Sequence, residues 1–158
     1  MRIKTTAQVL VVSSVMGLCA TPGLAAGGVH CQQVGGGALT NFIDASDTDG
    51  PATGDLRGAV GVAILGVSGN VYHVHHHWVT DSGDTIQLKD AFLTAFPTAD
   101  PNRVLADYLD GVDIIGGSGR FDGANGHLSS VFGAVDLNLG QLTLRYAGTV
   151  CFKPVPPP

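Results

Sequence analysis

The sequence predicts an all-β domain, and its composition gives two reasons for that prediction. The chain has 23 glycines among 158 residues, and many lie between short β-branched or aromatic runs, as in strands joined by tight turns. All 13 acidic residues are aspartate, which favours turns, and none is glutamate, which favours helices. The third reason is alternation near the end of the chain, where Leu142, Leu144 and Tyr146 share one face and Thr143 and Arg145 the other. Such a strand buries one face and exposes the opposite one.

Seven strands and one helix are expected along the chain, separated by turn residues such as Ser68-Gly69. The helix is expected over Asp100–Leu109, where Asp100 is placed to cap the first turn and Pro101 takes its first position. The strands are expected over Leu39–Ile43, Leu56–Val67, Asn70–Thr80, Thr85–Lys89, Val112–Ile115, His127–Leu137 and Gln141–Phe152.

The expected strand Leu56–Val67 is apolar on both of its faces. Val60 and Val62 lie on one face, and Ala63 and Leu65 lie on the other. A strand of this kind needs cover on both sides, from another element of the chain or from another subunit. We therefore expect the chain to self-associate.

Residues 1–26 have the pattern of a secretory signal peptide. Arg2 and Lys4 form a short basic start, and Val9–Ala20 is an apolar run broken only by two serines. Small residues that end at Ala26 then offer a cleavage site. The run is shorter than the roughly 20 apolar residues of a membrane span. The sequence therefore predicts a secreted or periplasmic protein, without a membrane span, once the signal is removed.

Removal of the signal leaves residues 27–153, which are enough for one domain and which we expect to form a β-barrel. A proline-rich tail follows over 154–158, and we expect it to be disordered. Cys19 leaves with the signal, so Cys31 and Cys151 remain, one near each end of the domain. In an oxidising compartment two such cysteines are expected to form a disulfide, and two free thiols are the alternative.

Charge and motifs exclude several classes of function. The formal net charge is −5 and the chain has no basic cluster, so nucleic acid and anionic membranes are poor partners. No G-x-S-x-G motif is present, and both remaining cysteines are assigned to the disulfide. A hydrolase with a serine or cysteine nucleophile is therefore disfavoured.

A glycine-rich segment over 116–126 reads Gly-Gly-Ser-Gly-x-Phe-x-x-Ala-x-Gly. It resembles the glycine-rich corner of the allene oxide cyclase and dirigent-like β-barrel family. Upstream, Asp44, Gly50-Pro51 and the glycines at 58 and 61 resemble the dirigent pattern of an aspartate, a Gly-Pro and a glycine-rich strand. The resemblance covers most of the chain from Asp44 to Phe152.

This resemblance implies a single antiparallel eight-stranded β-barrel with one short helical connection, a small-molecule cavity and a homotrimer. Two residues depart from the dirigent corner, because Asp122 and Asn125 stand where arginines are usual. The cyclases use a cavity glutamate, and this chain has no glutamate. Neither activity therefore transfers residue by residue. Asp44 alone matches a position with a role in the dirigent pocket.

The segment Tyr72–Trp78 contains four histidines on a predicted strand. His73, His75 and His77 share the face that we expect to point outward into solvent. Imidazoles spaced by two residues on a strand can bring two nitrogens to one metal ion. The sequence shows no clear carboxylate or cysteine to complete such a site, so we predict a polar outer face, no metal site and no cofactor.

The opposite face of the same strand carries the candidate site. His76 is expected to point into the barrel among Tyr72, Trp78 and Tyr146, where a neutral imidazole can act as a base or a hydrogen-bond donor. His76 and Asp44 are therefore the candidate catalytic residues, and Tyr72, Trp78 and Tyr146 the candidate ligand-binding residues. The alternative for His76 is a core histidine that bonds a neighbouring hydroxyl or carbonyl.

Three functions fit these features. We favour a secreted barrel that binds or guides a small apolar molecule in its cavity, as dirigent-like proteins do. The alternatives are a cofactor-free cyclase or isomerase of the allene oxide cyclase type, and a structural envelope protein with a filled barrel. Leu, Val, Tyr and Trp on the inner faces suit a pocket or a packed core equally.

Overall fold

The structure is a computed structural model that describes residues 28–153, so the expected signal peptide (1–26) and proline-rich tail (154–158) lie outside the described residues. None of the described helices is long and apolar enough to cross a membrane. The elements are β1 (His30–Phe42), β2 (Asp47–Gly54), β3 (Gly58–Ser68), β4 (Val71–Thr80), β5 (Thr85–Leu88), β6 (Ala91–Pro97), β7 (Arg103–Asp107), β8 (Val112–Gly117), the 3₁₀ turn η1 (Gly119–Phe121), β9 (Asn125–Asp136) and β10 (Gln141–Phe152).

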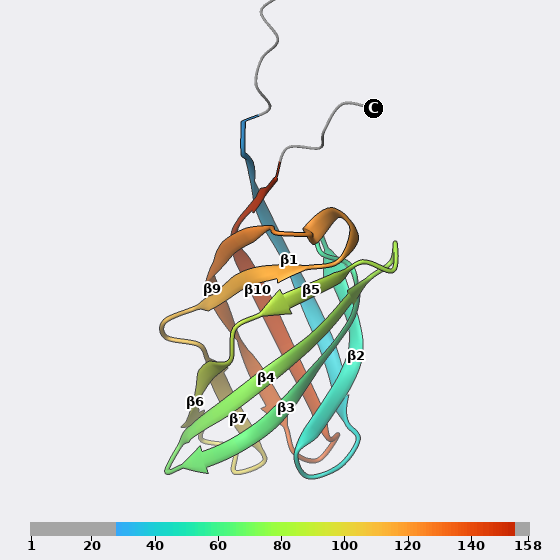
Figure 1. Cartoon of the computed structure of the whole chain (residues 1–158). Helices are drawn as coiled ribbons and strands as arrows, with labels where there is room; N and C mark the ends of the chain where they lie inside the picture. Colours follow the sequence, from blue (N-terminus) through green and yellow to red (C-terminus); the bar gives the residue numbers. More distant parts are fainter. Residues whose placement is uncertain (1–27, 154–158) are drawn as a thin grey trace, which may run out of the picture.

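These strands form one closed antiparallel β-barrel (Figure 1). β10 pairs with β1 on one side and with β9 on the other, so the sheet has no open edge there. β5 and β6 pair with opposite ends of β4, and β7 and β8 pair with opposite ends of β9. Each of these pairs of segments is one interrupted strand, which gives eight strand positions. The predicted eight-stranded antiparallel barrel is confirmed.

The two interruptions are short outward excursions of the chain. Leu88 and Ala91 are both buried, so the two residues between them, Lys89 and Asp90, are pushed to the outside of the barrel. Between β7 and β8 the chain turns at Gly111, whose φ of +65° favours glycine. Tyr108 stays buried at that turn, with its backbone N–H bonded to the Val131 carbonyl.

The helix predicted over Asp100–Leu109 is wrong. Arg103–Asp107 is β7, which pairs with β6 on one side and β9 on the other. Asp100 does accept a hydrogen bond from a backbone N–H two residues on, that of Asn102, but it caps a turn and not a helix. A hydrogen-bonded partner on each side outweighs the local preference of a short segment. The short helical connection is instead η1, in the glycine-rich corner.

β2 was not expected, because Gly50-Pro51 reads as a turn. In the structure β2 pairs along its length with β3, but its ladder with β1 omits Gly50 and Pro51. Proline lacks a backbone N–H, so it is tolerated where no ladder bond is required of it. β6 was also missed.

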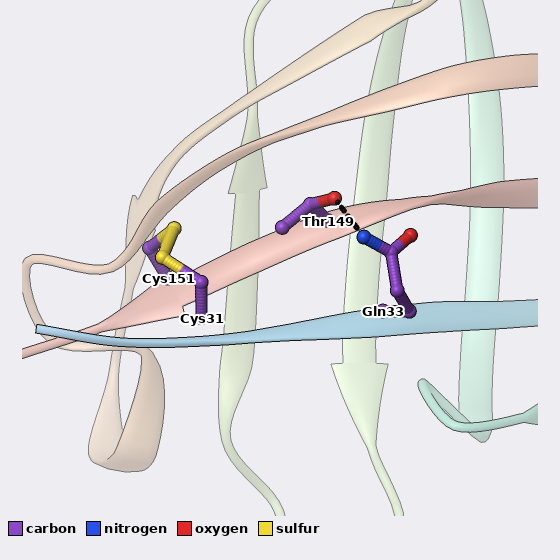
Figure 2. The surroundings of a disulfide bond; sticks show 4 residues. All are labelled: Cys31, Gln33, Thr149 and Cys151. Carbon is purple, nitrogen blue, oxygen red and sulfur yellow. Dashed lines mark hydrogen bonds between the residues drawn. A yellow bond between two sulfur atoms is a disulfide. The ribbon is translucent and has the colours of Figure 1, made fainter.

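The predicted disulfide joins the two strands that meet at the seam of the barrel. Cys31 in β1 and Cys151 in β10 lie directly opposite each other and are bonded, over a sequence separation of 120 residues. Figure 2 shows the next pair on the same side, where the Gln33 amide donates to the Thr149 hydroxyl at 2.9 Å. The disulfide therefore fixes the register of β1 against β10.

The two-sided apolar strand is covered on one side only. Val60 and Val62 are buried inside the barrel, whereas Leu65 and Val67 are 53% and 58% exposed. No described element lies over these two side chains. These two side chains are free to be covered by another subunit, and the expected self-association stays a prediction.

Candidate functional site

The barrel interior is divided into a filled half and a hollow half. The hollow half contains a cavity of about 230 Å³, whose wall reaches Phe42, Ala45 and Leu137. Phe42 ends β1, Ala45 lies between β1 and β2, and Leu137 follows β9, so the cavity reaches the turns that join β1 to β2 and β9 to β10. The filled half leaves a void of only about 20 Å³, beside His76 and Trp78.

Side-chain size explains the difference between the halves. In the hollow half β6 and β7 contribute small inward residues, among them Ala95 and Ala106. In the filled half the interior holds large residues, among them Trp78, Tyr108 and Phe121. Within the part of the chain that the structure describes, the barrel interior therefore leaves room for a molecule at its β6–β7 end.

The cavity wall is apolar apart from two hydroxyl-bearing side chains. Thr48 of β2 and Tyr72 of β4 are the polar residues of the wall, and no charged side chain from residues 28–153 lines it. The remaining wall residues are aliphatic or aromatic: Phe42, Ala45, Val62, Ile64, Val74, Leu93, Ala95, Val104, Ala106, Val135, Leu137 and Leu142. Such a surface favours an apolar molecule that carries at most one or two hydrogen-bonding groups.

Thr48 is oriented by a second buried threonine. Thr40 of β1 donates a hydrogen bond to the Thr48 hydroxyl at 3.0 Å, and both side chains are buried. The Thr48 hydroxyl hydrogen has no acceptor among the described residues. Because Thr48 lines the cavity, its hydroxyl can donate to an oxygen or nitrogen of a bound molecule.

His76 lies in the filled half, outside the wall of the open cavity. It points inward, as predicted from the alternation of β4, and is only 7% exposed. Its Nε2 bonds the Tyr108 hydroxyl at 2.9 Å, while its Nδ1 has no partner among the described residues. Burial, followed by the nearby His75, lowers the pKa of His76 to about 4. Burial likewise raises the pKa of Tyr108, so the pair is neutral at pH 7.

Trp78 and Tyr146 are also in the filled half, where they hold the turn between β2 and β3. The Trp78 indole donates to the Leu56 carbonyl at 2.7 Å, and the Leu56 N–H donates to the Tyr146 hydroxyl at 3.0 Å. The Tyr146 hydroxyl in turn donates to the Thr53 carbonyl at 2.8 Å. The two rings meet edge to face, with centroids 5.3 Å apart. These contacts satisfy the polar atoms of both side chains within the fold.

Replacing Tyr146 by phenylalanine should therefore lower the free energy of unfolding. The change leaves the N–H of the fully buried Leu56 without an acceptor, which costs about 1–3 kcal/mol. Urea denaturation measures the loss. The control is Tyr72→Phe, at a hydroxyl that bonds no described residue, where the change should stay within about 0.5 kcal/mol. Equal effects of the two substitutions would contradict this role for Tyr146.

Asp44 lies in the loop between β1 and β2 and stabilises that loop. Its carboxylate accepts hydrogen bonds from the backbone N–H groups of Ser46 at 2.7 Å and Asp47 at 2.9 Å, and from the Ser46 hydroxyl. These bonds, the Ser46 backbone bond first, lower the pKa of this fully exposed carboxyl. The structure does not bring Asp44 together with His76: Asp44 lines neither the cavity nor the void beside His76.

Of the predicted site residues, the structure thus places Tyr72 in the cavity wall and His76, Trp78 and Tyr146 in the filled half. Sequence reasoning missed Thr48 and Ala106, which lie on strands that it did not predict. A usable signal was present for β6, since Ala91, Leu93 and Ala95 alternate with larger or polar residues.

No protein-family model, no curated protein and no solved structure matches this sequence. The similarity to allene oxide cyclase and dirigent-like barrels consequently stays a prediction from the glycine-rich corner and the upstream residues. The fold that this similarity implied is present, but an eight-stranded barrel is compatible with many functions.

Proposed function

We propose that this protein binds a small apolar molecule in the open cavity of its barrel. The observation that carries the proposal is the cavity of about 230 Å³ with an apolar wall and two hydroxyl groups, at the open end of a barrel that is otherwise packed. A barrel that served only as a structural unit gains stability from filling its interior, because an empty apolar cavity is destabilising.

The cavity limits the size of the bound molecule. An apolar protein cavity of about 150 Å³ holds benzene, so this one takes roughly ten non-hydrogen atoms. Thr48 offers a hydrogen-bond donor in the cavity wall, and the Tyr72 hydroxyl offers a second polar group. The expected ligand is a compact one- or two-ring or branched molecule with a single oxygen.

Binding without covalent chemistry is favoured over the cyclase or isomerase alternative. An acid or base that acts on the ligand must reach it, and the cavity wall contains no aspartate or histidine among the described residues. His76 bonds Tyr108 in the filled half instead. The dirigent-like function, which guides a reactive molecule by shape, requires no such group.

The proposed setting is an oxidising compartment outside the cytoplasm, in keeping with the Cys31–Cys151 disulfide. A homotrimer, as the family resemblance implies, is part of the same proposal. Exposed apolar side chains on the outer face of β6, β7 and β9 support it: Phe96 lies opposite Leu105, and Phe132 is on the next strand.

The cavity is tested with 2-naphthol, a fluorescent two-ring molecule with one hydroxyl group. We expect the wild-type protein to bind it and Ala106→Phe to bind it at least about tenfold more weakly, because the new ring fills the cavity. Fluorescence titration measures both affinities. Thermal unfolding of Ala106→Phe should occur at or above the wild-type temperature, since filling a cavity adds apolar contacts.

The matched control is Ala134→Phe, which adds the same ring to the outer face of neighbouring strand β9, opposite Leu105. Its affinity for 2-naphthol should equal that of the wild type. If Ala106→Phe does not fold, Ala95→Leu fills the same cavity with a smaller side chain. Unchanged binding in the filled variants would show that the molecule binds elsewhere and would overturn the proposal.

A further inference from the structure

We propose that the outer face of β4 carries a binding site for a zinc ion, formed by His73, His75 and Asp90. The sequence places the two imidazoles two residues apart on one face of a strand but shows no third ligand near them. The structure supplies the third ligand, because the interruption between β5 and β6 projects Asp90 outward beside β4. This site lies outside the barrel and is independent of the apolar cavity.

The carboxylate of Asp90 lies between the two imidazoles. Its Oδ1 is 2.6 Å from Nδ1 of His75, and its Oδ2 is 3.8 Å from Nε2 of His73. Two ligands that share a tetrahedral zinc ion at about 2.1 Å are about 3.4 Å from each other. The two observed distances, one to each carboxylate oxygen, fall on either side of that value, so the proposed site requires side-chain rotations that bring both ring nitrogens and the carboxylate around one ion.

The three side chains are both held in place and reachable. The His73 ring stacks on Phe92 of β6 with centroids 5.0 Å apart, and backbone pairing sets His73 directly opposite Phe92. The histidine side chains are 40% and 38% exposed and that of Asp90 is 43% exposed, so an ion reaches them from solvent. Among residues 28–153 no group of three such side chains is already arranged to hold a metal ion. Binding of zinc would therefore require these three side chains to rotate toward one point.

The ligand types determine which metal fits. Two imidazole nitrogens and one carboxylate oxygen suit Zn²⁺ and Cu²⁺ and are a poor match for Ca²⁺ or Mg²⁺, which prefer oxygen ligands alone. A water molecule would take the fourth position on zinc. His77 is left out of the ligand set, because its ring packs edge-on against His75 and it makes no ion pair with Asp90 in the structure.

The site is tested by titrating the full untagged chain with Zn²⁺ in competition with a chromophoric chelator. We expect one zinc ion per chain with a dissociation constant in the micromolar range or below. His73→Gln, His75→Gln and Asp90→Asn should each weaken zinc binding at least about tenfold, since even partners of metal ligands contribute that much. These side chains are exposed, so the free energy of unfolding of each variant should lie within about 0.5 kcal/mol of the wild-type value.

Two matched variants serve as controls. His77→Gln removes the neighbouring imidazole, and His127→Gln removes a histidine that bonds Asp113 at 2.8 Å but has no second histidine beside it. Both should retain wild-type zinc affinity. Co²⁺ in place of zinc should give the visible absorption of a four-coordinate ion in the wild type and in both controls, but not in the three ligand variants.

The proposal is overturned if the wild type binds zinc only at millimolar concentration. It is also overturned if His77→Gln or His127→Gln loses affinity as much as the ligand variants do, because the ion then sits elsewhere. The 2-naphthol titration separates this outcome from the proposed function, since loss of zinc binding should leave the affinity of the cavity unchanged.

Discussion

Replacing Cys31 and Cys151 together by serine is expected to lower the free energy of unfolding by about 5 kcal/mol. The disulfide closes a loop with a sequence separation of 120 residues, and the loss of loop-closure entropy in the unfolded chain is about that large. The total free energy of unfolding of a single domain is about 5–15 kcal/mol, so this loss removes a large part of it. The double variant should therefore be only marginally folded at 37 °C. Urea denaturation followed by tryptophan fluorescence, through the single Trp78, measures the change.

Reduction of the wild-type protein is the control for this prediction. A reducing agent should bring the wild type close to the stability of the double variant and leave the double variant unchanged. A loss smaller than about 1 kcal/mol in both experiments would contradict the prediction. It would mean that pairing between β1 and β10 already restricts the unfolded chain in that region.

The strands that the sequence predicted correctly are those with alternation or a dense β-branched content. β4 and β10 both have alternation, and their inner and outer faces agree with the sequence pattern residue by residue. The prediction for β7 was wrong because Asp100-Pro101 begins a turn as readily as a helix. Only the pairing of this segment with β6 and β9 decides between the two. That pairing depends on residues distant in sequence and leaves no local pattern.

The candidate site was predictable in its orientation but not in its position along the barrel axis. Alternation correctly placed Tyr72 and His76 on the same inner face of β4. Whether that face meets a cavity depends on the residues of other strands, which include Ala95 and Ala106 around the cavity and Tyr108 and Tyr146 beside His76. The position of Asp90 in the proposed zinc site could not be predicted for a similar reason, because only the interruption of a strand turns its side chain toward His75.

In the filled half of the barrel, burial penalises the charged form of His76. His76 bonds the Tyr108 hydroxyl, and the void beside it is lined mainly by apolar side chains, with Thr40, Trp78 and Tyr146 as its other residues that bear polar atoms. Along β4 the nearest titratable groups are His75 and His77, with Asp90 beside them, and all three are on the outer surface. No carboxylate inside the barrel compensates a positive charge on His76 among the described residues.

Lowering the pH from 6.5 to 4 is therefore expected to destabilise the protein by roughly 3 kcal/mol through His76 alone. The pKa of this histidine falls from its ordinary 6.5 to about 4 on folding, because burial penalises the imidazolium. Between those two values the unfolded chain binds a proton that the folded chain does not, so stability falls as the pH falls. At pH 6.5 the unfolded histidine is still half protonated, so its contribution levels off about one pH unit higher, where His76 is neutral in both states.

The measurement is the free energy of unfolding in urea at several pH values, for the wild type and for His76→Gln. Glutamine can still bond the Tyr108 hydroxyl but does not titrate. Between pH 4 and 6.5 the free energy of unfolding of the variant should therefore depend much less on pH than that of the wild type. The comparison is confined to this window because the pKa values of Asp44 and Asp90 lie below their ordinary 3.8, and those groups change stability only in stronger acid. An equal slope in both proteins would mean that His76 gains a proton without opening the barrel. A water molecule at its unpartnered Nδ1, in the void of about 20 Å³ beside it, would then stabilise the charge.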